Sequence, residues 1–101
     1  MNKSILETVH EGAHDLHKAG VMDEITLREF DALCLPTVKA YSAQQIRHIR
    51  VKNKASQAVF ALYLNTSKST VQKWEQGMKK PNGPSLKLLN LVDQKGLEVL
   101  A

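Results

Sequence analysis

Two histidines and a glutamate near the start of the chain have the residue types and spacing of a metal site. His10-Glu11-Gly12-Ala13-His14 spells H-E-x-x-H, and His17 follows three residues later. Residues four apart share one face of a helix, so both imidazoles can bind one zinc ion while the glutamate acts as a general base. A zinc-binding enzyme is therefore one alternative for this chain.

The surroundings of this motif argue against catalysis. It begins ten residues from the start of the chain, with little sequence in front of it to build a substrate cleft, and Gly12 weakens the helix by about 1 kcal/mol relative to alanine. No matching downstream ligand motif, glycine-rich phosphate loop or cysteine–histidine pair accompanies it. We therefore expect no enzyme activity, catalytic residue, cofactor or metal site. Cys34, between two leucines, is expected to be a small core residue.

Composition places the chain among small cytoplasmic proteins. Of its 101 residues, 43% are hydrophobic and 24% are charged, and a single cysteine excludes an intrachain disulfide and fits a reducing compartment. No apolar run is long enough to span a membrane. Glu7, Glu11 and Asp15 interrupt the apolar stretch that a signal peptide needs.

The net charge of +4 combines two halves of opposite sign. Residues 1–40 carry four basic groups against seven acidic ones, whereas residues 41–101 carry ten against three. A basic half is typical of a protein with a polyanionic partner, and an acidic half favours a second, basic partner. We therefore expect an acidic N-terminal arm over residues 1–41 and a second domain over residues 42–101.

Two short helices are expected in the arm. Apolar residues spaced three or four apart predict a helix over residues 4–19, with Ser4 as its N-cap. A capping box at Thr26 and Glu29 predicts a second helix that starts there and ends before Pro36. An extended linker then leads to the second domain.

Helix signals recur at short intervals in the second domain, and no strand pattern is present. Ser42, Ser56, Ser67 and Ser85 are expected N-caps of four helices, and Gly96 precedes a short fifth helix. The fold class is therefore expected to be all-α, with a five-helix domain behind a helical arm that is partly disordered when free. The expected core positions are Ile46, Ile49, Phe60, Ala61, Leu64, Val71, Trp74, Leu88, Leu89 and Val92.

The helices expected over residues 56–64 and 67–76 are joined only by Asn65 and Thr66. So short a turn forces a steep angle between packed helices, the helix-turn-helix arrangement, in which the second helix enters the major groove of DNA. The stretch SQAVFALYLNTSKSTVQKWEQG resembles the helix-turn-helix of the Cro/cI repressor family, also called the XRE family. Asn65 replaces the usual glycine of the turn, and asparagine tolerates a positive φ best after glycine.

The outward face of the second helix and the resemblance together suggest a role for each position of the motif. The expected base readers are Lys68, Ser69 and Gln72, because lysine can read guanine and glutamine can read adenine. The expected phosphate contacts are Gln57, Ser67, Thr70, Lys73, Arg47, Lys54 and Lys79. For Gln57 the resemblance implies either a phosphate contact or support of its neighbour in the next helix. The expected structural residues are Ala61, Leu64, Val71, Trp74, Glu75 and Arg50, with Glu75 paired to Arg50 as the family pattern implies. In the alternative interpretation, Ser67 is only an N-cap and the lysines are ordinary solvated side chains.

The layout of the whole chain resembles the HigA-type antitoxins, in which an XRE domain accompanies a segment that neutralises a toxin. The resemblance implies a RelE/HigB-like toxin as partner, a small basic mRNA nuclease, and repression of the operon that encodes both proteins. The candidate toxin-binding residues are Leu6, Glu7, Val9, Glu11, Asp15 and Leu16. The alternative is a stand-alone XRE-family regulator whose arm serves only in dimerisation.

A homodimer is expected because one recognition helix reads too few base pairs for useful specificity. Two half-sites would then lie about 34 Å apart, one turn of DNA. The last helices, through Leu97 and Leu100, are favoured as the dimer surface over the apolar stripe of the arm.

Overall fold

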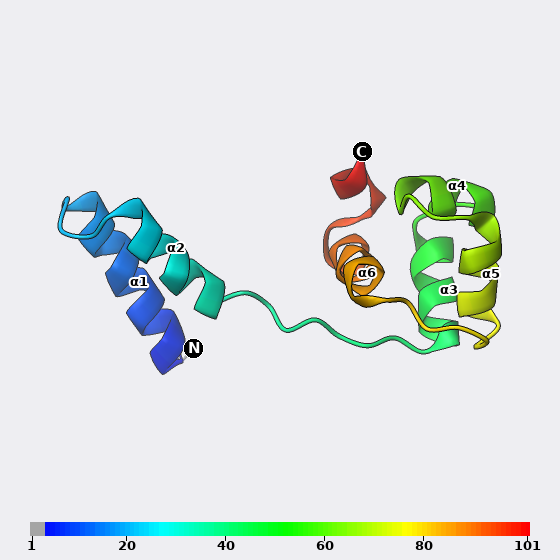
Figure 1. Cartoon of the computed structure of the whole chain (residues 1–101), viewed down its shortest axis with the longest axis horizontal. Coiled ribbons are helices and arrows are strands. Elements are labelled where there is room, and N and C mark those ends of the chain that lie inside the picture. The colour runs from blue at the N-terminus through cyan, green and yellow to red at the C-terminus, as the bar shows by residue number, and fades with distance from the viewer. Residues whose placement is uncertain (1–3) are drawn as a thin grey trace. The chain divides into compact units, whose positions relative to one another are not determined.

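The computed structural model describes residues 4–101, and every regular element in that range is a helix (Figure 1). The order is α1 (Ile5–Lys18), α2 (Glu24–Leu33), α3 (Ala43–Lys52), α4 (Gln57–Tyr63), α5 (Lys68–Glu75), α6 (Gly83–Lys95) and a 3-10 helix, η1 (Leu97–Leu100). The predicted all-α class is confirmed for these residues. None of the helices among them has the length and apolar character to cross a membrane.

The chain divides into two compact units, and the boundary along the sequence falls between Thr37 and Val38. The sequence analysis put the boundary at Tyr41, where the expected extended linker ends and the charge changes sign. Hydrogen bonds assign the intervening residues to the second unit. The backbone N–H of Lys39 donates to Asn90 Oδ1 at 2.8 Å, and the Tyr41 hydroxyl donates to Asp93 Oδ2 at 2.8 Å.

One hydrophobic cluster holds the second unit together. α3 lies against both α5 and α6, α4 packs on α5, and η1 packs on α6 (Figure 1). Phe60, Val71 and Leu89 are completely buried, and burial of each such side chain contributes about 1.5–3 kcal/mol. Leu88 packs against the cluster from a partly buried position, and the other expected core residues are all buried.

Side-chain caps start the helices of both units. The Ser4, Ser42, Ser56 and Ser67 side chains accept from the backbone N–H three residues on, as predicted. At Ser4 and Ser42 the side chain three residues on, Glu7 or Gln45, accepts from the backbone N–H of the cap residue and completes a capping box. These bonds satisfy backbone donors that would otherwise be unpaired in the first turn.

Two predicted helix starts were wrong by a few residues. α2 begins at Glu24, because the Asp23 carboxylate accepts from the backbone N–H of Thr26 at 2.7 Å. α6 begins at Gly83, because the Asn82 side chain accepts from the backbone N–H of Ser85 at 3.0 Å. The predicted caps, Thr26 and Ser85, therefore stand at the third helical position, where their backbone N–H groups donate to the side chain of the actual cap.

The first unit is a pair of packed helices, α1 and α2, with very little interior. Its only buried hydrophobic residues within the described range are Ala13 and Leu27. Cys34 is half-buried, with its thiol 3.9 Å from the Leu6 carbonyl, so its prediction as a core residue was wrong. A unit of this size has almost no interior in which a cysteine at a helix end can be buried.

Candidate nucleic-acid interface

The turn between α4 and α5 has the backbone geometry that its sequence predicts. Asn65 has a φ of +54°, in the left-handed region that asparagine adopts more readily than most residues. The backbone N–H of Thr66 donates a hydrogen bond to the Ala61 carbonyl at 2.9 Å, and this bond ends α4. Gly77, with a φ of +73°, ends α5. α4 and α5 are therefore joined as a helix-turn-helix.

α5 presents a buried face and an exposed face. Val71 and Trp74 point into the core, and Trp74 is only 2% exposed. The three predicted base readers, Lys68, Ser69 and Gln72, are exposed in the first turn and a half of the helix. Helix periodicity sets this division, because residues three or four apart share a face. The exposed face carries an ammonium, a hydroxyl and an amide, which are groups that hydrogen-bond to base edges.

The two hydroxyls at the start of α5 bond to each other. Ser67 Oγ accepts from the backbone N–H of Thr70 at 3.1 Å, and the two side-chain hydroxyls lie 2.8 Å apart. Ser67 is therefore an N-cap in this structure, as the alternative interpretation holds. Its exposed position at a helix N-terminus still allows a phosphate contact, because the helix dipole favours an anion there.

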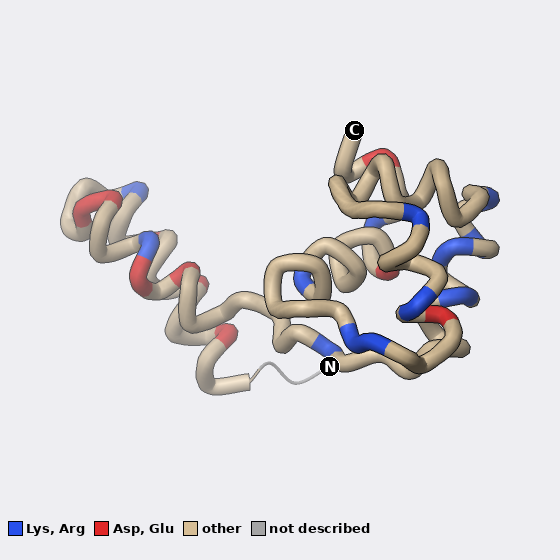
Figure 2. The backbone as a smooth tube through the Cα atoms, turned by 45° about the vertical axis from the view of Figure 1, so that its right-hand side comes forward, with Lys and Arg blue, Asp and Glu red and all other residues tan. Residues whose placement is uncertain are grey.

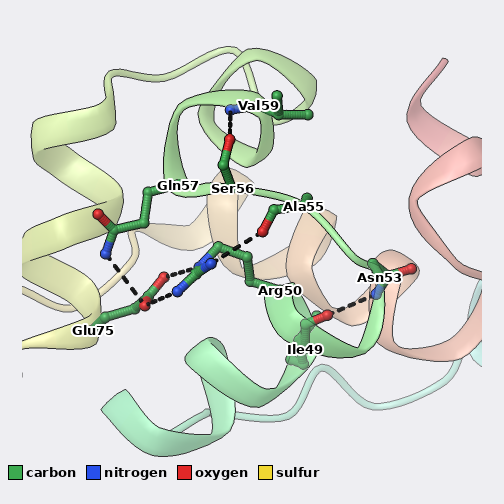
Figure 3. Close-up of polar contacts among 8 residues, drawn as sticks. All are labelled: Ile49, Arg50, Asn53, Ala55, Ser56, Gln57, Val59 and Glu75. Atoms are coloured by element: carbon green, nitrogen blue, oxygen red, sulfur yellow. Dashed lines mark hydrogen bonds and ion pairs between the residues drawn. The ribbon is translucent and has the colours of Figure 1, made fainter.

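A charged pair in the domain joins α3 to α5 (Figure 3). Arg50 Nε and Nη2 donate to the two oxygens of Glu75 at 2.7 and 2.8 Å, and Arg50 Nη1 donates to the Ala55 carbonyl at 3.0 Å. The side chains are only 14% and 5% exposed, respectively. This bidentate pair fixes how α5 lies against α3.

The environment of this pair keeps both groups charged. Burial by itself would raise the pKa of Glu75, but hydrogen bonds from Arg50 and Gln57 hold that pKa below its ordinary value. The bond to Glu75 raises the pKa of Arg50. Gln57, at the first position of α4, donates its amide to Glu75 Oε1 at 3.4 Å and so supports α5 from a second helix.

The remaining predicted phosphate contacts are basic side chains on the surface of the second unit. Arg47 on α3, Lys73 on α5, and Lys54 and Lys79 beyond the ends of those helices are all exposed. Figure 2 shows that Lys and Arg predominate along residues 38–101, whereas most of the Asp and Glu lie in the first unit. An excess of positive charge on a surface attracts a polyanion and makes its binding dependent on salt.

Two asparagines that the sequence analysis did not single out bond the first residues of the second unit to α6 and the start of η1 to the end of α3. Asn90 is 4% exposed and bonds both backbone groups of Lys39, which ties the linker to α6. Asn53 donates to the Ile49 carbonyl at 2.7 Å and accepts from the backbone N–H of Leu97 at 3.1 Å. The available signal for Asn90 was its place in the apolar run LLNLV, where a lone amide needs partners.

The surface predicted for dimerisation, formed by Leu97 and Leu100, is less exposed than expected. Leu97 is 7% exposed and belongs to the core cluster, against which Leu100 also packs. Leu97 is therefore a core residue, because the bend at Gly96 turns η1 back onto α6. On α4, by contrast, Leu62 is 77% exposed and Tyr63 is 40% exposed.

The candidate toxin-binding residues lie on α1, in the first unit. Leu6, Val9 and Leu16 are each 45% exposed. Glu7, Glu11 and Asp15 are exposed, and the Glu7 carboxylate accepts from the Ser4 backbone N–H at 3.4 Å. An open apolar groove between α1 and α2 is lined by Val9, Gly12, Ala13, Asp15, Leu16, Met22 and Phe30.

Comparison with known proteins agrees with the geometry of the second unit. A helix-turn-helix family model matches residues 46–100, from within α3 to the end of η1. The chain is also 43% identical, over 53 residues, to the protein named Antitoxin HigA-2 of Vibrio cholerae. That match covers 52% of this chain and 51% of the relative, so the similarity spans about half the length of each. The chain therefore belongs to the helix-turn-helix family and carries a DNA-binding domain of the XRE type.

Proposed function

We propose that the protein is a sequence-specific transcriptional repressor that reads operator DNA through α5. The observation that carries this proposal is the exposed face of α5, where Lys68, Ser69 and Gln72 follow a capped helix N-terminus. Lys73 and Arg47 supply affinity by neutralising phosphates beside the groove. The Arg50–Glu75 pair holds α5 in position for this contact.

Single substitutions on α5 test this proposal. Lys68→Ala and Gln72→Ala each weaken specific binding by about 1–3 kcal/mol, because each removes a contact to a base edge. Lys95→Ala and Gln94→Ala are matched controls, since they remove the same groups from exposed positions on α6. Operator affinity is measured by fluorescence anisotropy. If both α5 variants bind like the wild-type chain, these residues do not read bases.

The repressor acts as a homodimer, which places two α5 helices in successive major grooves. Leu62 and Tyr63 on α4 form an exposed apolar patch beside Leu100, and we assign the dimer contact to this patch. Leu62→Glu therefore gives a monomer in sedimentation analysis and weakens operator binding, whereas Val51→Glu, at another exposed apolar position, does neither. A dimer that persists in Leu62→Glu excludes this patch.

We propose further that the protein is an antitoxin that neutralises a RelE/HigB-like toxin in the cytoplasm and represses its own operon. The similarity to an antitoxin over half of each chain supports this role. The first unit is acidic and leaves apolar side chains exposed, as a segment that binds a small basic protein would. The groove between α1 and α2 is the assigned contact.

The toxin proposal is tested with the short basic protein that a neighbouring reading frame would encode. The two proteins are expected to bind in isothermal titration calorimetry. Leu16→Glu in the groove weakens binding by at least about tenfold. Val21→Glu is the matched control, because Val21 is 74% exposed and does not line the groove. If the genome holds no such neighbour, or if the neighbour does not bind, a stand-alone regulator is the better description.

A further inference from the structure

Three potential metal ligands converge between the two helices of the first unit. His10 Nε2 lies 2.5 Å and His14 Nε2 lies 2.8 Å from the same oxygen, Asp31 Oδ1. The two Nε2 atoms are 3.1 Å apart, and the rings meet edge to face with centroids 4.7 Å apart. Two imidazole nitrogens and one carboxylate oxygen therefore face a single point.

The packing of α1 on α2 creates this cluster. His10 and His14 are four residues apart on α1, so both lie on one face. Ala13, next to His14, is buried in the contact with α2, where Leu27 is also buried. Asp31 follows Leu27 by one helical turn, and this places its carboxylate at the edge of the contact, opposite both imidazoles.

The three groups suit a divalent transition-metal ion. Imidazole and carboxylate are common zinc ligands, with bonds of about 2.0–2.2 Å, and in a tetrahedral site such ligand atoms lie about 3.3 Å apart. The observed separations of 2.5–3.1 Å need to open by less than about 1 Å, a change that side-chain rotation supplies. All three side chains are partly exposed, so an ion can enter from solvent.

Local electrostatics also favour a cation at this point. Asp31 brings one carboxylate to the cluster, and its negative charge attracts a cation. His17, Glu24 and Arg28 line a shallow pocket beside the cluster, where the opposite charges of Glu24 and Arg28 offset each other. The sequence analysis set the H-E-x-x-H pattern aside because of its position, its weak helix and the lack of a downstream ligand motif. Folding supplies a third ligand from 17 residues downstream of His14.

The first unit also has a small hydrophobic core, so a bound ion would add stability that the core does not supply. It comprises the residues up to Thr37, and only Ala13 and Leu27 among its described hydrophobic residues are buried. Units below about 40 residues usually depend on a metal, a disulfide or a partner for stability. An ion held by α1 and α2 together would stabilise their packing by an amount that grows with the logarithm of its affinity for the folded unit.

We propose that His10, His14 and Asp31 bind one divalent transition-metal ion, with Zn²⁺ as the best fit, and that this ion joins α1 to α2. Water completes the coordination, and the ion's role is structural. The site requires neither DNA nor a toxin, so it is independent of the function proposed above.

Zinc titration of the untagged full-length chain tests this proposal. In competition with a chromophoric chelator, the wild-type chain is expected to bind one Zn²⁺ per chain. His14→Ala and Asp31→Asn each lower that affinity by at least about tenfold, because each removes a ligand. His17→Ala and His48→Ala are the matched controls and bind like the wild-type chain. Far-UV circular dichroism checks that each variant keeps the helical content of the metal-free wild-type chain.

Histidine ring ¹⁵N spectra identify the ligand atoms directly. Zn²⁺ is expected to shift the Nε2 signals of His10 and His14 and to leave those of His17 and His48 unchanged. The proposal is overturned if Asp31→Asn and His14→Ala bind as tightly as the wild-type chain. It is also overturned if His17→Ala abolishes binding while Asp31→Asn retains it, or if zinc binds only weakly at several positions.

Discussion

Replacing Glu75 by alanine is expected to leave Arg50 charged and without its partner inside the DNA-binding domain. The pair has two hydrogen bonds, of 2.7 and 2.8 Å, and its carboxylate side chain is only 5% exposed. Breaking a buried pair by removing one member costs about 3–5 kcal/mol, since the remaining charge stays desolvated. Arg50 is 14% exposed and keeps its bond to the Ala55 carbonyl, so we expect the lower end, about 3 kcal/mol.

The loss is measurable through the single tryptophan. Trp74 is buried in the second unit, so its fluorescence during urea denaturation follows the unfolding of that unit. A loss of about 3 kcal/mol lowers the melting temperature of a domain of this size by roughly 12–24 °C. Glu98→Ala is the matched control, because it removes an exposed carboxylate from the same unit and leaves stability nearly unchanged.

A double variant separates the charge effect from packing. Arg50→Met with Glu75→Leu replaces both charges by apolar side chains, and it should recover most of the lost stability because no unpaired charge remains. The reasoning is refuted if Glu75→Ala costs less than about 1 kcal/mol, as an exposed pair would. It is also refuted if the double variant is as unstable as Glu75→Ala.

Three further expectations follow from the polar contacts of Glu75, Tyr41 and Asn90 in the second unit. Because the pKa of Glu75 is lowered in the folded domain, this carboxylate contributes its full stability above the ordinary glutamate pKa of about 4.3 and loses it as the pH falls further. Glu75→Gln should therefore reduce the loss of stability in acid, measured by unfolding followed through Trp74 fluorescence. Burial and the bond to Asp93 raise the pKa of Tyr41 to about 12, so a tyrosine titration near that pH in absorbance at 295 nm should vanish in Tyr41→Phe. Asn90→Ala leaves the backbone groups of Lys39 unpaired and should cost about 1–3 kcal/mol in urea unfolding, whereas an unchanged stability would mean that water replaces those bonds.

The helix-turn-helix was largely predictable because its signals are local. Serine caps, a short Asn-Thr turn and apolar residues at helical spacing place α3, α4 and α5, and the structure agrees with each. The exposed position of Lys68 and Gln72 follows from the buried position of Val71 and Trp74. Helix periodicity alone carries this information.

The features that were missed depend on contacts distant in sequence. Asp31 meets His14 only because α1 packs on α2, and no spacing rule links residues 17 positions apart on different helices. Leu97 was wrongly predicted to lie at a dimer surface. It is buried because the bend at Gly96 turns η1 back onto α6, and no local pattern in the sequence indicates that bend. The starts of α2 and α6 were misplaced because Asp23 and Asn82 cap as readily as Thr26 and Ser85.

Binding to DNA from upstream of the protein's own gene tests the central claim most directly. Fluorescence anisotropy is measured with a labelled operator fragment and a scrambled duplex at several salt concentrations. The account predicts preferential binding to the operator. It also predicts a slope of log affinity against log salt of about −7, if Arg47, Lys54, Lys73 and Lys79 each neutralise one phosphate in both chains of a dimer. Equal binding to the two duplexes, or no binding, would contradict the assignment of α5 as a recognition helix.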